Sequence, residues 1–226
     1  MHVYRLLTVF IKAILLVTLS FRCVAEIETQ TAYTPDALLQ KAIQEGNMND
    51  IFSLLEKRED VNQPFSQGIT PLHTAVIHNQ INVVTLLLET GANANAMDLS
   101  TQATPLHLAA LYGRDKIATV LLEHGANKNA VMKFGITPLL VAAQFNQLPI
   151  IQLLIDKKIN VDQSDHDGFT ALHFAAQNGN TAIAELLLVQ GAKANIRDRN
   201  QSTPLNIATQ NNQSEVVALL SRYTKD

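Results

Sequence analysis

Thr70-Pro71-Leu72-His73 is the stretch that decides the fold, because the same four letters return at residues 104–107. Related tetrapeptides begin at Thr137, Thr170 and Thr203, so successive threonines lie 34, 33, 33 and 33 residues apart. A period of this size is typical of stacked supersecondary units, each of which buries its apolar face against its neighbours. Such a stack offers an extended surface to partners and seldom a catalytic pocket.

Each copy of the repeat predicts two helices. The threonine suits the N-cap of the first helix, and the proline after it suits the first helical position, where no amide donor is needed. A glycine or asparagine follows nine residues after each threonine and is expected to end that helix in the left-handed conformation. Apolar residues at helical spacing, such as those at 83–88, then predict the second helix.

This pattern resembles the ankyrin repeat, a turn plus two antiparallel helices with the signature T-P-L-H-x-A. The resemblance covers residues 36–226 and recurs in register at five threonines. It implies an all-α solenoid of about six stacked helix-turn-helix units, with protruding β-turn or hairpin fingers. The expected units are an N-terminal cap repeat at 36–67, repeats at 68–101, 102–134, 135–167 and 168–200, and a truncated C-terminal cap repeat at 201–226.

Four positions depart from the repeat pattern. In the first unit, Ala37 stands where the threonine is expected. Gln102 and Gln201 replace the turn glycine of the other units, so we expect those two turns to be deformed. Lys158 replaces the glycine that ends the other second helices, which predicts a less regular finger after the fourth unit.

The first 25 residues differ from the rest of the chain. A short apolar run at 13–21 lies between Lys12 and Arg22, and small residues stand at Cys23 and Ala25. This composition predicts a secretory signal peptide at 1–25, followed by a short linker at 26–35. The alternative is a membrane anchor, but a spanning helix needs about 20 apolar residues. We therefore expect an exported protein, periplasmic or secreted, with no stable membrane insertion after cleavage.

The charge of the remaining chain argues against nucleic-acid binding. Three of the 17 basic residues and none of the 20 acidic ones precede residue 26, which leaves a net charge of −6 with histidine neutral. No basic run survives to contact phosphates. The single cysteine also lies in the first 25 residues, so stability must come from packing and not from disulfides.

We find no pattern of catalytic, cofactor-binding or metal-binding residues in the sequence. His73, His107 and His173 recur at one repeat position, where the family resemblance implies a structural role, and a metal site would need ligands at short spacing. The segment 165–167 begins like a calcium loop, but residue 176 is alanine where a glutamate ligand belongs. We therefore expect no enzyme activity, cofactor or metal.

The resemblance to ankyrin repeats places partner contacts at the ends of the first helices and at the turn tips. On this sequence the helix-end positions are Ile77, His78, Leu111, Tyr112, Gln144, Phe145, Gln177 and Asn178. The turn positions are Phe134, Ile136, His166, Asp167, Phe169, Arg199 and Asn200. The apolar members of this set either form an exposed band for a partner or pack against the neighbouring unit.

These observations predict a monomeric, exported, non-enzymatic module that binds another protein through its concave face and turn tips. A role as scaffold or protector of a periplasmic protein is one form of this function. The alternatives are a secreted effector that acts on host proteins and a small metal-binding or enzymatic protein that uses the repeat histidines.

Overall fold

The computed structural model describes residues 34–66 and 68–224. The described residues contain twelve α-helices and no strand. The helices follow in order as α2 (Pro35–Glu45), α3 (Met48–Leu55), α4 (Pro71–Ile77), α5 (Ile81–Glu89), α6 (Pro105–Tyr112), α7 (Asp115–Glu123), α8 (Pro138–Gln144), α9 (Leu148–Asp156), α10 (Ala171–Asn178), α11 (Thr181–Val189), α12 (Pro204–Gln210) and α13 (Ser214–Tyr223). One short 3-10 helix, η2 (Lys133–Gly135), lies in the loop before α8.

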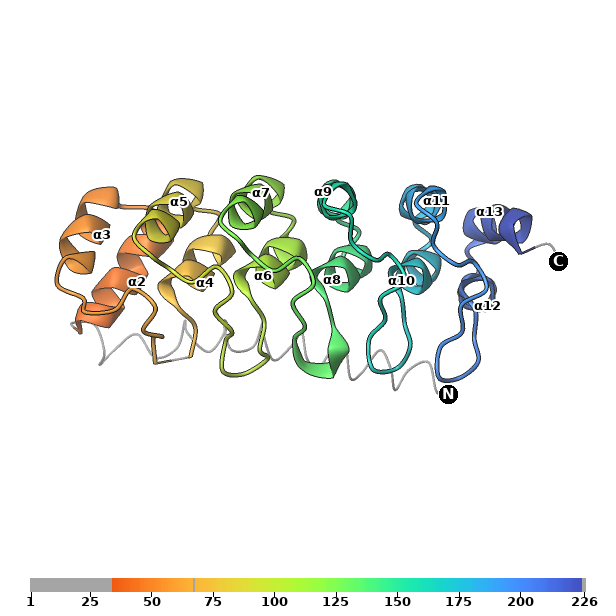
Figure 1. Cartoon of the computed structure of the whole chain (residues 1–226), viewed down its shortest axis with the longest axis horizontal. Helices are drawn as coiled ribbons and strands as arrows, with labels where there is room; N and C mark the ends of the chain where they lie inside the picture. Colours follow the sequence, from red (N-terminus) through yellow and green to blue (C-terminus); the bar gives the residue numbers. More distant parts are fainter. Residues whose placement is uncertain (1–33, 67, 225–226) are drawn as a thin grey trace.

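The helices form two parallel rows along one axis. Figure 1 shows consecutive helices paired, with α2, α4, α6, α8, α10 and α12 in one row and their partners in the other. The loop that leads from each pair to the next extends beyond the first row, at the lower edge of the figure. An all-helical ankyrin-type stack is therefore confirmed, while residues 1–33, and with them the predicted signal peptide and most of the linker, lie outside the described residues.

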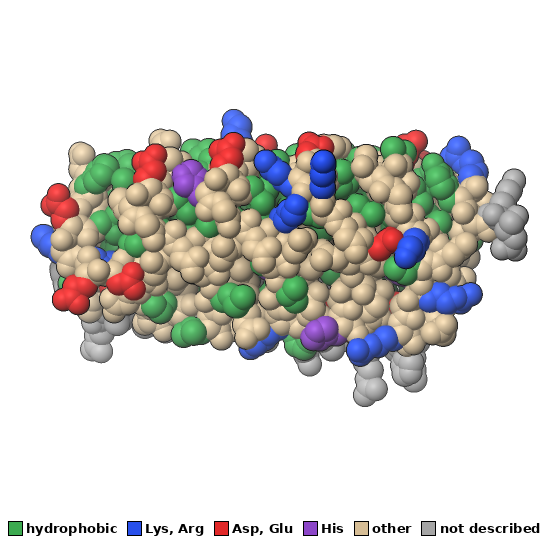
Figure 2. Space-filling view, viewed as in Figure 1, with side chains coloured by type: hydrophobic (Ala, Val, Ile, Leu, Met, Phe, Trp, Pro, Cys, Tyr) green, Lys and Arg blue, Asp and Glu red, His purple; other side chains and the backbone are tan. Residues whose placement is uncertain are grey.

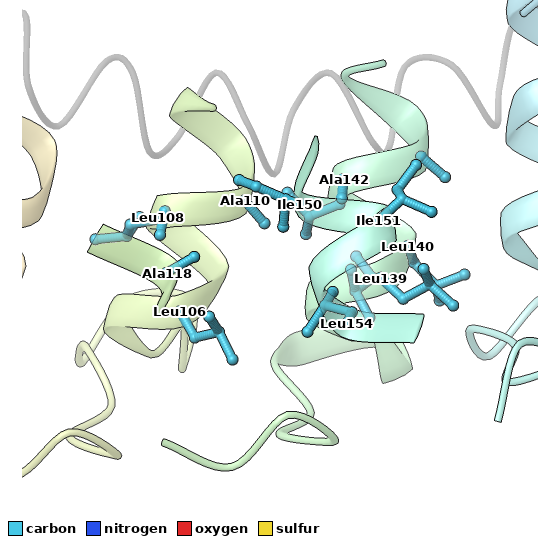
Figure 3. Packing of buried hydrophobic residues seen from close by; sticks show 14 of the residues in the cluster. Leu106, Leu108, Ala110, Ala118, Leu139, Leu140, Ala142, Ile150, Ile151 and Leu154 are labelled. Atoms are coloured by element: carbon cyan, nitrogen blue, oxygen red, sulfur yellow. The ribbon is translucent and has the colours of Figure 1, made fainter. Parts of the chain in front are cut away.

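The core fills the space between successive helix pairs. First helices contribute small side chains at their centres, such as Ala110 and Ala142, and these are fully buried. Figure 3 shows larger side chains of α9, Ile150 among them, projecting toward the pair α6–α7. Small residues let the first helices approach closely, and the leucine and isoleucine side chains fill the remaining volume at interior density.

The predicted helix ends are present throughout the described chain. Asn79, Asn146 and Asn212 have φ angles of 59°, 58° and 57°, and the glycines at the same repeat position are left-handed as well. The start of the first unit differs from the prediction, because Thr34 caps α2 and the helix begins at Pro35. Ala37 therefore lies inside α2, which extends for 11 residues where the other first helices have 7 or 8.

The deformations predicted at three of the departing positions do not occur. Gln102, Lys158 and Gln201 adopt φ angles of 62°, 58° and 62°, so each takes the left-handed conformation that glycine takes elsewhere. Contacts with the neighbouring units impose this backbone conformation, although it is strained for a residue that has a side chain. A non-glycine residue in this conformation costs roughly 1–2 kcal/mol.

Candidate partner-binding surface

The ends of the first helices form one row, because α4, α6, α8 and α10 pack side by side. Ile77, Leu111, Tyr112 and Phe145 occur in this row, and each is half-buried and packed against the core. Burial raises the pKa of Tyr112, which agrees with this partial enclosure. These side chains therefore support the stack and are still partly accessible to solvent.

The polar residues of the same row differ in how far their side chains are exposed to solvent. Gln144 and Gln177 are half-buried, and His78 is exposed. Asn178 is exposed, but its side-chain amide donates to the carbonyl oxygen of Gln144 at 2.8 Å. Asn178 therefore ties two units together as well as lining the surface.

Two of the predicted contact residues are wrong. Ile136 and Phe169 are only 3% and 8% exposed, and both belong to the hydrophobic core. Each immediately precedes a helix-capping threonine, where the chain turns inward before the helix starts. Phe169 packs its ring 5.1 Å from the ring of His173. Neither side chain is available to a partner on the folded chain.

The remaining turn positions lie on the surface. Phe134 is 48% exposed, and His166, Arg199 and Asn200 are exposed as well. Asp167 is half-buried and forms an ion pair with Arg199, with 3.5 Å between the carboxylate oxygen and the guanidinium nitrogen. Phe134 holds a left-handed φ of 67°, which turns the loop sharply at its tip.

Backbone hydrogen bonds join these loops in sequence. The amide of Leu99 donates to the carbonyl of Gly68 at 3.2 Å, and the amide of Lys133 donates to the carbonyl of Thr101 at 3.0 Å. The same contact runs from His166 to Phe134 and from Arg199 to Asp167, each at 2.9 Å. Neighbouring loops are therefore held in register, and side chains at one repeat position lie next to each other along the edge.

The loop before α4 buries Phe65 between the exposed residues Pro64 and Ser66. In each of the four later loops, one residue at the equivalent position is likewise buried between two exposed residues. The buried residues are Asp98, Met132, Asp165 and Asp198. Alternation of inward and outward side chains is the property of an extended backbone. The exposed neighbours, which we call the tip pairs, are Met97 with Leu99, Val131 with Lys133, Ser164 with His166, and Arg197 with Arg199.

Sequence reasoning missed Met97, Leu99, Val131 and Arg197 as surface residues. Met97 and Leu99 are exposed by 53% and 75%, and Val131 by 48%. The signal that could have identified them is their position beside the residue that recurs five or six places before each threonine. That residue is aspartate in three loops, and its neighbours on both sides must then point outward.

The buried aspartates serve the loops themselves. Burial raises the pKa of Asp98, but hydrogen bonds from Ser100 and Thr101 outweigh it, so the pKa of Asp98 is lowered. Asp165 has only backbone donors, from Asp167 and Phe169, and burial raises its pKa to about 6. These carboxylates stabilise turns.

The three histidines join consecutive units. In each, Nδ1 lies within hydrogen-bonding distance of the capping threonine's amide and hydroxyl, and Nε2 reaches a carbonyl of the following loop. For His107 the Nε2 distance to the Ile136 oxygen is 3.1 Å, and burial lowers its pKa to about 4. A neutral ring with a proton on Nε2 fits this geometry. Across residues 34–66 and 68–224, no group of three or more histidine, cysteine, aspartate or glutamate side chains is placed to hold a metal ion.

Comparison with known proteins agrees with the repeat architecture. The family model for ankyrin repeats in three copies matches residues 38–132 and again residues 139–226. The chain belongs to the ankyrin-repeat family. Ankyrin repeats are protein–protein interaction modules and are typically non-enzymatic, so the coarse prediction of a binding module is supported.

Among the curated proteins, one that matches does so over a short stretch. It is the palmitoyltransferase Hip14 of Drosophila melanogaster, 40% identical over 57 residues. The alignment spans 25% of this chain and 9% of that protein. The name of the relative therefore describes a much longer protein. Among the described residues of this chain, no helix has the length and apolar character needed to span a membrane.

Proposed function

We propose that this ankyrin-repeat chain is an exported, non-enzymatic, monomeric module of about six units. It holds a partner protein against the surface formed by the first-helix ends and the tip pairs. The observation that carries the proposal is the run of exposed apolar side chains at Leu99, Val131 and Phe134, on loops held in register by backbone hydrogen bonds. Large apolar side chains exposed together on a rigid frame are typical of interaction sites.

Several observations support this proposal over its alternatives. Half-buried Tyr112 and Phe145 add apolar surface at the ends of the first helices. Aromatic side chains give large contact area at low entropic cost. The histidines that a metal or enzyme mechanism would need already use both ring nitrogens in contacts within the stack. A periplasmic scaffold and a secreted effector both require export, which the composition of residues 1–25 favours.

The decisive experiment places a photo-crosslinking amino acid at position 134 or 144 of the full chain expressed in its own host. A matched pair at Glu89 and Glu123, both exposed on second helices, serves as control. We expect one discrete crosslinked product from positions 134 and 144 and none from the controls. The mass of the recovered protein should match a chain that begins at Glu26. Equal crosslinking from both surfaces would refute the proposed binding face.

A further inference from the structure

From Met97 onward, the tip pairs change their chemistry in one direction along the stack. The pair Met97 and Leu99 is apolar, and the next pair, Val131 and Lys133, combines an apolar residue with a cation. The pair Ser164 and His166 is polar, and the last pair, Arg197 and Arg199, carries two cations. All eight side chains are exposed. We call this graded line of eight residues the tip edge.

The gradient is visible on the molecular surface. Figure 2 shows apolar side chains along the left and centre of the lower edge and cationic side chains gathering toward its right end. Two carboxylates adjoin this cationic end: Asp167, which is paired with Arg199, and Asp198, which is buried between the two arginines in the sequence. The side chain of Arg199 is nevertheless 69% exposed, so its guanidinium can bind a second anionic group. Arg197 donates to the carbonyl of Gln201 at 2.8 Å and is likewise exposed.

The charge of the tip edge is opposite to that of the rest of the chain. Exposed carboxylates such as Glu89, Glu123 and Glu185 lie on the second helices, and the chain from residue 26 onward has an excess of six acidic over basic residues with histidine neutral. An acidic partner is repelled by most of the molecule and attracted to this end of the edge. Complementary charge of this kind fixes orientation and register more than it adds affinity.

We propose that the tip edge binds an extended segment of a partner protein in which apolar residues adjoin a run of aspartate or glutamate residues. The apolar part packs over Met97, Leu99 and Val131, and the acidic part pairs with Arg197 and Arg199. This inference rests on the proposed function and specifies the chemistry of the partner. The hydrogen-bonded loops supply a rigid edge, so little ordering of this chain opposes binding.

The test uses a synthetic peptide in which a block of leucine and phenylalanine is joined to a block of aspartates. Its binding to the folded protein is measured by fluorescence anisotropy. Two further peptides replace the aspartates by lysines or the apolar block by serines. Of the three peptides, we expect only the one with both the apolar block and the aspartates to bind well. Its affinity should fall as the salt concentration is raised, because exposed charge pairs are screened.

Variants of the protein locate the site. Arg197→Glu with Arg199→Glu should weaken binding by at least about tenfold, since each reversed charge removes an attraction and adds a repulsion. The matched control is Lys116→Glu with Lys157→Glu, which changes the net charge equally at exposed positions away from the edge. Leu99→Ser with Val131→Ser should also weaken binding, whereas Val189→Ser with Phe52→Ser, at exposed positions elsewhere, should not. Thermal melts of each variant establish whether it is folded.

Three results would overturn the inference. The first is equal binding of the aspartate and lysine peptides, and the second is unchanged binding by the double arginine variant. The third is that the tip edge binds something other than the peptide. This would appear as binding to phosphatidylglycerol vesicles, or as self-association in sedimentation velocity, that is lost in the double arginine variant while no peptide binding is detected. Crosslinking at position 134 combined with any of these results would leave the proposed function standing and remove only this partner chemistry.

Discussion

Two sets of residues at equivalent repeat positions behave in opposite ways. Leu72, Leu106, Leu139 and Leu172 occupy one position in four first helices and are all almost completely buried. Leu99, Lys133, His166 and Arg199 occupy one position in four loops and are all exposed. The first helices, which we call the helical wall, keep leucine at this position because each leucine must fill the same space between neighbouring units. The tip edge varies because neighbouring loops meet there through backbone hydrogen bonds, which any residue type can form.

The largest expected effect compares the two regions directly. Leu121 in α7 is fully buried, and Leu121→Ala should lower the free energy of unfolding by roughly 2–5 kcal/mol, because it leaves a cavity between helix pairs. Leu99→Ala at the tip edge should change it by about 0.5 kcal/mol or less. Urea denaturation followed by circular dichroism measures both. Similar losses in the two variants would show that the loops also carry the stability of the stack.

A second comparison separates contacts between units from contacts within one unit. His107 links its own helix start to the carbonyl of Ile136 in the next loop, whereas the side-chain hydrogen bonds of Asn206, at the same repeat position, stay within its own unit, at Thr203. His107→Ala should therefore lower the free energy of unfolding by about 1–3 kcal/mol, because buried polar partners lose their contact. Asn206→Ala should cost distinctly less. An equal loss would mean that the link across the unit boundary adds nothing.

The sequence predicted the helical wall well because its signals are local and repeated. Capping threonines, prolines at the first helical position and left-handed asparagines such as Asn79 all occur where expected. Local rules failed where the stack imposes the backbone path. Gln102 keeps the turn that glycine makes elsewhere, although the residue type alone favours a deformed turn.

The candidate surface was predicted only in part. Phe134 and Arg199 are exposed as expected, but Ile136 and Phe169 are buried, since the direction of a side chain in a loop depends on how the loop meets its neighbour. Alternation about the buried residue of each loop places Leu99 on the surface, and this requires knowing that the loop is extended there. The periodicity of the helices carries no information on that point.

The dependence on pH sharpens the contrast between histidine and aspartate in the stack. Burial lowers the pKa of His107 from 6.5 to about 4, so the unfolded chain binds a proton there more readily than the folded chain. The contribution of neutral His107 to the free energy of unfolding is present above pH 6.5 and is lost as the pH falls toward 4. Its slope is at most about 1.4 kcal/mol per pH unit.

Asp165 acts in the opposite direction. Burial raises its pKa from 3.8 to about 6, so the folded chain binds the proton more readily, and Asp165 favours folding as the pH falls through this interval. We therefore expect Asp165→Asn to make the acid-induced loss of stability steeper and His107→Leu to make it shallower. Urea denaturation at a series of pH values tests both. If neither variant changes the slope, these buried groups do not control the pH dependence.

The smallest expected effect concerns the strain that the stack imposes on its loops. Gln102 is left-handed with a φ of 62°, a conformation that glycine adopts without steric cost. Relief of roughly 1–2 kcal/mol of strain is partly offset by the greater freedom of glycine in the unfolded chain. Gln102→Gly should therefore stabilise the protein by about 0.5–1 kcal/mol. Gln152→Gly, at an exposed position inside α9, should destabilise it by about 1 kcal/mol, because glycine is a poor helix former. Opposite signs for the same substitution would show that the neighbouring units, and not the local residue, set the backbone of this loop. A loss in both variants would mean that the Gln102 side chain itself stabilises the turn.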